Sequence, residues 1–266
     1  MPKKQTKEKT GVPSKLPGNQ MVPINEIPGL EGIDNEMLII PRIKLVQGLS
    51  VEVSEGICAP GALVNSITKD ILAAKGESLE IVPLMISRSR LKFQSMDDGG
   101  GLLCRSNDGF EGIGDPGGNC LTCPARNWGA DKTPPECTEI LNVAVMPLGE
   151  FIGTPLILSF GKTSFNVGKM FINMMATKKV SPWFLKYQLS TKFIEDKKGK
   201  YFVYKVLPDG DAPADFAEMM ETQYKILKTT EYEIHSDEAE MHEEAENAIQ
   251  NENSKRNPGQ GEDDPF

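Results

Sequence analysis

The sequence predicts a mainly β protein: a five-stranded barrel with a cysteine-rich loop inserted, one C-terminal amphipathic helix and disordered termini. Short runs rich in Val, Ile, Leu, Phe and Tyr recur along the middle of the chain and end at Gly, Pro or Asp. One helical pattern falls between the third and the fourth run, and the two ends hold few large apolar residues. Strand, strand, strand, helix, strand, strand is the order of an OB-fold.

The first predicted strand covers residues 38–53, where Ile, Leu and Val form strand-like runs that break near Gly48. Pro41 indicates a sheet edge or a bulge, because proline lacks the N–H that a central strand must donate. Residues 61–74 fit a short helix and a simple connection equally well. Cys58 is interpreted as an ordinary buried thiol.

The next predicted strand, residues 81–93, is basic on one face. Its second half alternates, so that Arg88, Arg90 and Lys92 share one face and less polar side chains share the other. Such a row of cations suits a chain of phosphate groups. A solvated outer face explains the same pattern, and a single strand does not separate the two interpretations.

Four of the five cysteines fall in residues 102–138, as Cys104, Cys120, Cys123 and Cys137. Two cysteines separated by two residues can hold one metal ion from a single turn, and two more from flanking segments complete a tetrahedron of thiolates. The segment is rich in Gly and Pro and has too few apolar residues for a core of its own, so a bound ion would stabilise it. We expect a structural zinc ion. Disulfides, free thiols and an iron–sulfur cluster remain as alternatives.

Two short β-rich runs follow at residues 140–146 and 155–160, readable as one bent strand or as a hairpin. Residues 163–176 carry apolar side chains at roughly helical spacing behind a Thr and Ser start, which predicts a helix. Residues 183–194 and 201–207 are predicted to be two strands joined by a tight turn.

The last two strands carry aromatic residues among lysines. Rings on which bases stack and cations that meet phosphates are what binding of an unpaired nucleic-acid strand requires. Alternation also predicts that about half of these rings face the core instead.

No catalytic constellation is found. Gly161, Lys162 and Thr163 lie between a strand and a helix as a phosphate-binding loop does, but leucine stands where that motif begins with glycine. The two histidines, His235 and His242, fall in the acidic C-terminal stretch, and the His-x-Glu partner of a zinc deaminase is absent upstream of the paired cysteines. We therefore expect a protein that is not an enzyme.

Composition divides the chain into four parts. They are a flexible N-terminal arm (1–36), a DNA-binding domain with the zinc loop 102–138 (37–208), a linker with an amphipathic helix (209–230) and an acidic disordered tail (231–266).

The net charge of −9 is distributed unevenly along the chain. Residues 38–208 carry 20 Lys and Arg against 16 acids, whereas residues 209–266 carry 4 against 17. A basic body with an acidic tail is frequent among proteins that bind nucleic acid. No apolar run approaches the ~18 residues needed to cross a bilayer, and no apolar segment follows the N-terminal lysines. We expect a soluble, cytoplasmic protein.

The last five residues are Glu262, Asp263, Asp264, Pro265 and Phe266. This ending resembles the acidic tip of bacterial single-stranded DNA-binding proteins. The resemblance implies that Asp263, Asp264, Pro265 and Phe266 dock into partner proteins of replication and recombination, where a pocket takes the ring and a basic residue meets the terminal carboxylate. With its cysteine loop and the segment 161–207, the chain is also similar in plan to phage-encoded single-stranded DNA-binding proteins, some of which combine an OB-fold, a zinc site and an acidic C-terminus.

We therefore expect a protein that binds and protects single-stranded DNA without strong sequence preference during phage DNA replication, recombination and repair. The alternative is a zinc-ribbon transcription or replication adaptor that binds proteins or duplex DNA. Whether the chain forms a homo-oligomer stays open. The predicted DNA contacts are Arg88, Arg90, Lys92, Arg105, Trp128, Lys186, Tyr187, Lys192, Phe193, Tyr201 and Tyr204.

Overall fold

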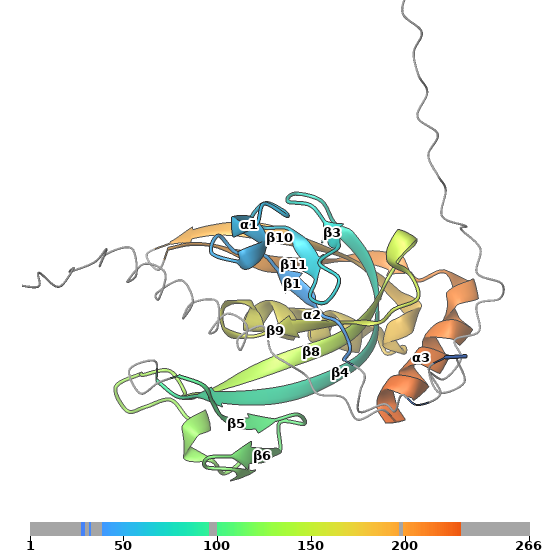
Figure 1. Cartoon of the computed structure of the whole chain (residues 1–266). Coiled ribbons are helices and arrows are strands. Elements are labelled where there is room, and N and C mark those ends of the chain that lie inside the picture. The colour runs from blue at the N-terminus through green and yellow to red at the C-terminus, as the bar shows by residue number, and fades with distance from the viewer. Residues whose placement is uncertain (1–27, 30–31, 33–38, 96–99, 197–198, 230–266) are drawn as a thin grey trace, which may run out of the picture.

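The computed structural model describes residues 28–29, 32, 39–95, 100–196 and 199–229. Within them the chain is mainly β, as the sequence predicts, and its paired strands are antiparallel (Figure 1). The strands are β1 (Ile43–Leu45), β2 (Leu63–Asn65), β3 (Ile71–Ala73), β4 (Leu79–Phe93), β5 (Leu102–Ser106), β6 (Glu111–Gly114), β7 (Gly118–Asn119), β8 (Cys137–Pro147), β9 (Leu156–Phe160), β10 (Leu185–Asp196) and β11 (Gly199–Asp211). The α-helices are α1 (Val51–Ser54), α2 (Phe165–Lys178) and α3 (Ala217–Thr229).

The long strand β4 organises the larger of two sheets. β8 pairs along one side of β4 over Ile81–Lys92, while β10 pairs near the start of β4 and β5 pairs near its end. The full path runs β11-β10-β4-β5-β6-β7, with β8 and β9 branching from β4, and β1-β2-β3 form a separate three-stranded sheet. One bent strand therefore connects the β10–β11 hairpin to the cysteine segment, which Figure 1 shows at opposite ends of β4.

Contacts on both sides of β1 join the small sheet to the large one. Arg42, just before β1, forms an isolated parallel bridge with Ile157 in β9. On the other side, the side-chain amide of Gln47 donates to the carbonyl of Phe202 at 3.0 Å and accepts from its N–H at 2.9 Å. This amide therefore pairs with the backbone of β11 as a residue of a neighbouring strand would. Because the described strands form no closed sheet, the five-stranded OB-fold barrel is not confirmed, although the mainly β class is.

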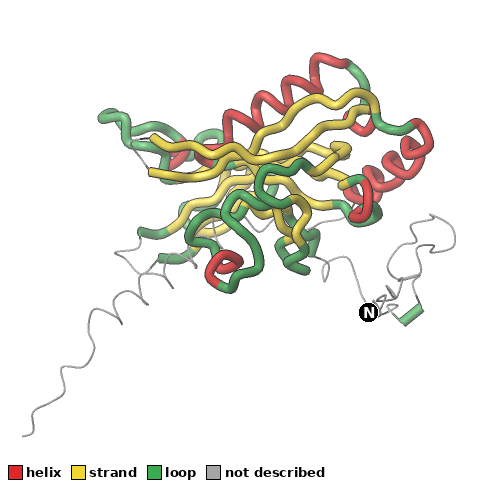
Figure 2. Tube along the Cα trace, turned by 90° about the horizontal axis from the view of Figure 1, so that it is seen from above, coloured by secondary structure: helices red, strands yellow, loops and turns green. Residues whose placement is uncertain are grey.

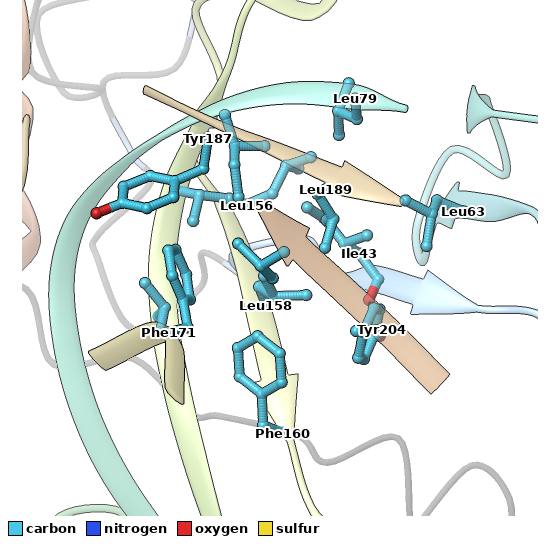
Figure 3. Close-up of a cluster of buried hydrophobic side chains, with 14 of the residues drawn as sticks. Ile43, Leu63, Leu79, Leu156, Leu158, Phe160, Phe171, Tyr187, Leu189 and Tyr204 are labelled. Atoms are coloured by element: carbon cyan, nitrogen blue, oxygen red, sulfur yellow. The ribbon is translucent and has the colours of Figure 1, made fainter. Parts of the chain in front are cut away.

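The main core fills the space between the two sheets and α2. Figure 3 shows Phe160, Phe171, Tyr187 and Tyr204 among the side chains of this core. Phe171 and Tyr187 make an edge-to-face contact at 4.8 Å between centroids, and Phe160 and Tyr204 make another at 5.4 Å. The hydroxyl of Tyr204 donates to the carbonyl of Ile43 at 2.9 Å. These rings hold β9, β10, β11 and α2 together, because packed aromatic pairs add to the free energy of apolar burial.

A second, smaller core lies under α3. Met220 and Leu227 of this helix are buried against Val82 and Leu84 of β4. Figure 2 shows the longer helices at the margin of the sheets rather than between them. The amphipathic pattern predicted for residues 214–229 therefore has its expected cause, an apolar face that packs on a sheet.

Most predicted elements are confirmed. The strand 81–93, the helix 163–176 and the final strand pair all form, and residues 140–160 form a hairpin of β8 and β9 rather than one bent strand. Residues 61–74, expected to be a short helix or a simple connection, form the strands β2 and β3 instead.

Two further stretches differ from the prediction. Residues 51–54 are the short helix α1 instead of a strand, because Glu52 turns inward and binds Lys44 at 3.2 Å and Lys69 at 3.1 Å. Burial alone would raise the pKa of the Glu52 carboxyl, but a backbone hydrogen bond and the two lysines outweigh burial and lower it. The strand β11 also extends to Asp211, through part of the predicted linker.

The arm predicted for residues 1–36, apart from residues 28, 29 and 32, and the tail predicted for 231–266 lie outside the described residues. No helix in the described ranges is both long enough and apolar enough to cross a membrane.

Candidate metal centre and nucleic-acid interface

The sheet register places two of the four clustered cysteines in one row. Lys92 in β4 pairs with Cys104 in β5 on one side and with Cys137 in β8 on the other. Residues paired directly across antiparallel strands carry their side chains on the same face. Cys104, Lys92 and Cys137 therefore lie side by side on one face of the sheet.

The other two cysteines come from the end of the inserted segment. Cys120 follows β7, and its N–H donates to the carbonyl of Phe110 at 2.7 Å. Cys123 caps the short 3-10 helix η4 (Pro124–Arg126). All four cysteines line a single pocket, and four cations line it with them, namely Arg90, Lys92, Arg105 and Arg126.

Gly112 leaves space beside two of these sulfur atoms. A Cβ atom at this position would lie 3.0 Å from the Sγ of Cys104 and 3.6 Å from the Sγ of Cys120. The first distance is too short for an unstrained contact, so both sulfur atoms approach a space that only glycine leaves free. Burial raises the pKa of the Cys137 thiol, and the nearby guanidinium of Arg90 acts in the opposite direction.

The donor set fits a thiolate metal site in chemistry, although its atoms are not gathered into a coordination sphere. Four thiols on one pocket are ligands that zinc prefers. However, no three His, Cys, Asp or Glu side chains in the described ranges are grouped so that they could hold a metal ion. The five cysteines are free thiols, and Cys58, expected to be buried, is half-buried outside this cluster.

The basic face of β4 forms as predicted, but acids occupy it. Arg88 and Arg90 bind the two carboxylate oxygens of Glu139 at 3.2 Å and 2.8 Å, and Lys92 binds Glu136 at 3.1 Å. Arg90 is only 5% exposed. The hydrogen bond to Glu136 raises the pKa of Lys92. These cations bind acids of the fold and do not form an open stripe.

The predicted contacts on β10 and β11 separate into buried and exposed residues. Tyr187 and Tyr204 belong to the core, at 2% and 4% exposure, so their rings are covered. Lys186 is held by Asp209 at 3.0 Å and Glu80 at 3.4 Å. Phe193 is 48% exposed and lies against Phe202, with ring centroids 5.2 Å apart.

The opposite side of this hairpin is the surface that we call the outer face: Ser190, Lys192, Ile194, Tyr201, Val203 and Lys205. Cross-strand pairs of Ser190 with Lys205, Lys192 with Val203 and Ile194 with Tyr201 place all six side chains together.

Lys192 and Lys205 are exposed, and neither makes an ion pair within the described part of the chain. Tyr201 is half-buried and donates its hydroxyl to Asp196 at 3.0 Å. Sequence reasoning left Lys205 out of the predicted contacts, although its position opposite Ser190 follows from the hairpin turn.

The cysteine segment carries its own exposed apolar side chains. Trp128, predicted as a DNA contact, is 65% exposed, and Phe110, Ile113 and Leu121 are also more than half exposed. Arg105, another predicted contact, is half-buried at the pocket. The predicted partner hook, Asp263, Asp264, Pro265 and Phe266, lies outside the described residues.

Comparison with known proteins identifies a family but no characterised relative. The model of the family described as Pam3 phage gp34-like protein matches residues 19–233. No curated protein and no solved structure matches the chain. The matched range spans every strand and all three α-helices described above. The chain therefore belongs to the Pam3 phage gp34-like family.

Proposed function

We propose that this protein binds single-stranded DNA through the outer face of the β10–β11 hairpin, without strong sequence preference, in phage DNA replication, recombination and repair. The observation that carries the proposal is the pair of exposed lysines beside Tyr201 on one strand pair, neither of which makes an ion pair with another described residue. Lysines neutralise phosphates, and a ring can stack on any base, so such a surface is tolerant of sequence.

A second ring on the same hairpin supports the proposal. Phe193 lies on the opposite side from Lys192 but beyond the end of the core, which leaves about half of its ring accessible. It rests on Phe202, and the ammonium of Lys75 lies 5.5 Å from the centroid of the Phe202 ring. A single DNA strand that crosses the edge of the hairpin would meet aromatic rings and lysines on both faces of the hairpin.

The distribution of charge favours the hairpin over the cysteine segment as the DNA surface. Residues 185–211 carry 6 Lys against 4 acids, whereas residues 102–138 carry 3 Lys and Arg against 5 acids. Phosphate binding depends on local positive potential and releases counterions from the DNA. The acidic tail would compete with DNA for the same lysines, and its tip would recruit partner proteins. We also propose, as the finer fold assignment, a relation to the OB-fold barrel.

The proposal is tested with the full chain and a labelled oligothymidine, in competition with duplex and unlabelled single strands at one salt concentration. Replacing Lys192 or Lys205 by glutamine should weaken binding and reduce the slope of log K against log salt by about 0.7 each. Lys225→Gln is the matched control, because Lys225 is an exposed lysine of α3 that pairs with Glu221 at 2.8 Å. Tighter binding of duplex, or equal salt slopes for all three variants, would overturn the proposal.

The exposed apolar side chains favour a second candidate, the adaptor that binds another protein. Phe110, Ile113, Leu121 and Trp128 gather in a segment with more acids than bases, a composition that suits a protein surface better than phosphates. The same competition assay separates the candidates. An adaptor would show no preference for single strands, and its hairpin variants would behave like the wild type.

A further inference from the structure

We propose that the four clustered cysteines bind one zinc ion as thiolates, and that Arg90 and Lys92 balance the charge of this centre instead of contacting DNA. The pocket joins all four sulfur ligands to both cations. The inference is independent of DNA binding, and it reassigns two residues that the sequence alone favours as phosphate contacts.

Charge is the first argument. A zinc ion with four thiolate ligands carries a net charge of about −2. In a partly buried pocket such a centre is costly unless cations or hydrogen-bond donors surround it. Among the residues that the structure describes, four basic side chains and no acid line the pocket. The pocket therefore has the composition expected around an anionic cluster.

Arg90 supplies the second argument. Its side chain is 6% exposed, and one terminal nitrogen binds Glu139 at 2.8 Å. Its Nε is buried and has no hydrogen-bond partner in the described part of the chain. A buried N–H without an acceptor is unfavourable, and an ionised sulfur beside it would supply the missing acceptor. The guanidinium of Arg90 would then bind Glu139 through a terminal nitrogen and a thiolate through Nε.

Lys92 supplies the third argument through the register of the sheet. It stands in the row between Cys104 and Cys137, and its side chain is only 20% exposed. The bond to Glu136 holds its ammonium at the rim of the cluster. Phosphates of a bound strand would have to displace Glu136 to reach this lysine, whereas thiolates would be its neighbours already.

The pocket also has room for the sulfur atoms to converge. Metal binding has to bring them closer together than they lie in the described structure. Gly112 leaves free the space beside Cys104 and Cys120, and the connections around Cys120 and Cys123 are short turns rather than long strands. Such a segment can close around an ion at little cost to the sheet that carries Cys104 and Cys137.

The test uses the full chain, purified under reducing conditions, with elemental analysis and with cobalt(II) as a spectroscopic probe. We expect one zinc per chain, and cobalt spectra with thiolate charge-transfer bands and the strong visible bands of a tetrahedral site. Arg90→Gln and Lys92→Gln should lower zinc affinity by about 10–100-fold in competition with a chelator, the range for groups that support metal ligands. Arg90→Lys should restore part of the loss, and Lys225→Gln, the control variant on α3, should leave zinc affinity unchanged.

If the variants of the buried Arg90 fail to fold, Lys92→Gln alone still tests the proposal, because the Lys92 side chain is more exposed. At saturating zinc, Lys92→Gln should bind single-stranded DNA as the wild type does. The proposal is wrong if reduced protein gives no thiolate bands with cobalt, if Lys92→Gln keeps full zinc affinity, or if it loses DNA affinity at saturating zinc. A failure of DNA binding in the wild type would leave the metal measurements unaffected, so the two proposals fail separately.

Discussion

The basic face of β4 and the outer face of the β10–β11 hairpin have the same kind of sequence but differ in what lies opposite. On β4, Arg90 pairs across the sheet with Glu139, and the cysteine segment brings Glu136 to Lys92. On the hairpin, Lys192 faces Val203 and Lys205 faces Ser190, so no acid stands across from either lysine. The comparison shows that alternation decides which face a cation occupies, while the neighbouring strand decides whether its charge remains available to a ligand.

The largest effect that would sharpen this comparison concerns the rings of the hairpin. Tyr187→Ala should lower the free energy of unfolding by about 3–5 kcal/mol, because it empties a ring-sized space in the core beside Phe171. Tyr201→Ala should cost less than about 1 kcal/mol, because its ring is only half-buried and its hydroxyl binds the exposed Asp196. Urea unfolding followed by circular dichroism measures both. Equal losses of unfolding free energy would contradict the assignment of Tyr187 to the core and of Tyr201 to the outer face.

A smaller effect tests the compensated row on β4. Glu139→Gln should lower the free energy of unfolding by about 1.5–3 kcal/mol, because the nearly buried Arg90 loses its charged partner. The matched control is Glu195→Gln, whose partner Lys200 and whose own side chain are both more than half exposed. It should change stability by less than about 1 kcal/mol. Both variants are measured by the same urea unfolding. Equal losses in the free energy of unfolding would contradict the difference between the buried and the exposed ion pair.

The smallest effect tests pairing within the hairpin itself. Lys186 lies on the same side of β10 as Lys192 but is held by Asp209. Hydrogen bonds from Gln188 and then from Lys186 lower the pKa of Asp209, so this carboxylate stays charged down to a lower pH than an ordinary aspartate. Its contribution to stability is lost only as pH falls through that lowered pKa.

At neutral pH, Asp209→Asn should therefore leave Lys186 with Glu80 as its acidic partner and raise single-stranded DNA affinity by less than about fivefold, since an ion pair at the surface is worth at most ~1 kcal/mol. Asp215→Asn removes an exposed acid just before α3 and controls for net charge. Binding is measured by fluorescence anisotropy. A gain of the same size in the control would show that net charge, not pairing, is the cause.

Much of the fold could be predicted from the sequence because its signals are local. The apolar face of residues 214–229 predicted a helix that packs on a sheet, and Met220 and Leu227 are buried as that pattern requires. The strands predicted for residues 183–194 and 201–207 pair as a hairpin, with Ile194 opposite Tyr201. The spacing of Cys104, Cys120, Cys123 and Cys137 predicted that they meet, and they line one pocket.

What the sequence by itself determined is therefore the class of the fold, the positions of most strands and helices, and the clustering of the four cysteines. The tertiary structure alone decided which rings and cations are available. Tyr187 and Phe193 share one side of β10, yet the first is covered by Phe171 and the second extends past the core. Arg90 is nearly buried, and its guanidinium binds Glu139 of the neighbouring strand instead of facing solvent. Periodicity reports only the direction of a side chain, whereas exposure depends on elements that are distant in the chain and that no local pattern can specify.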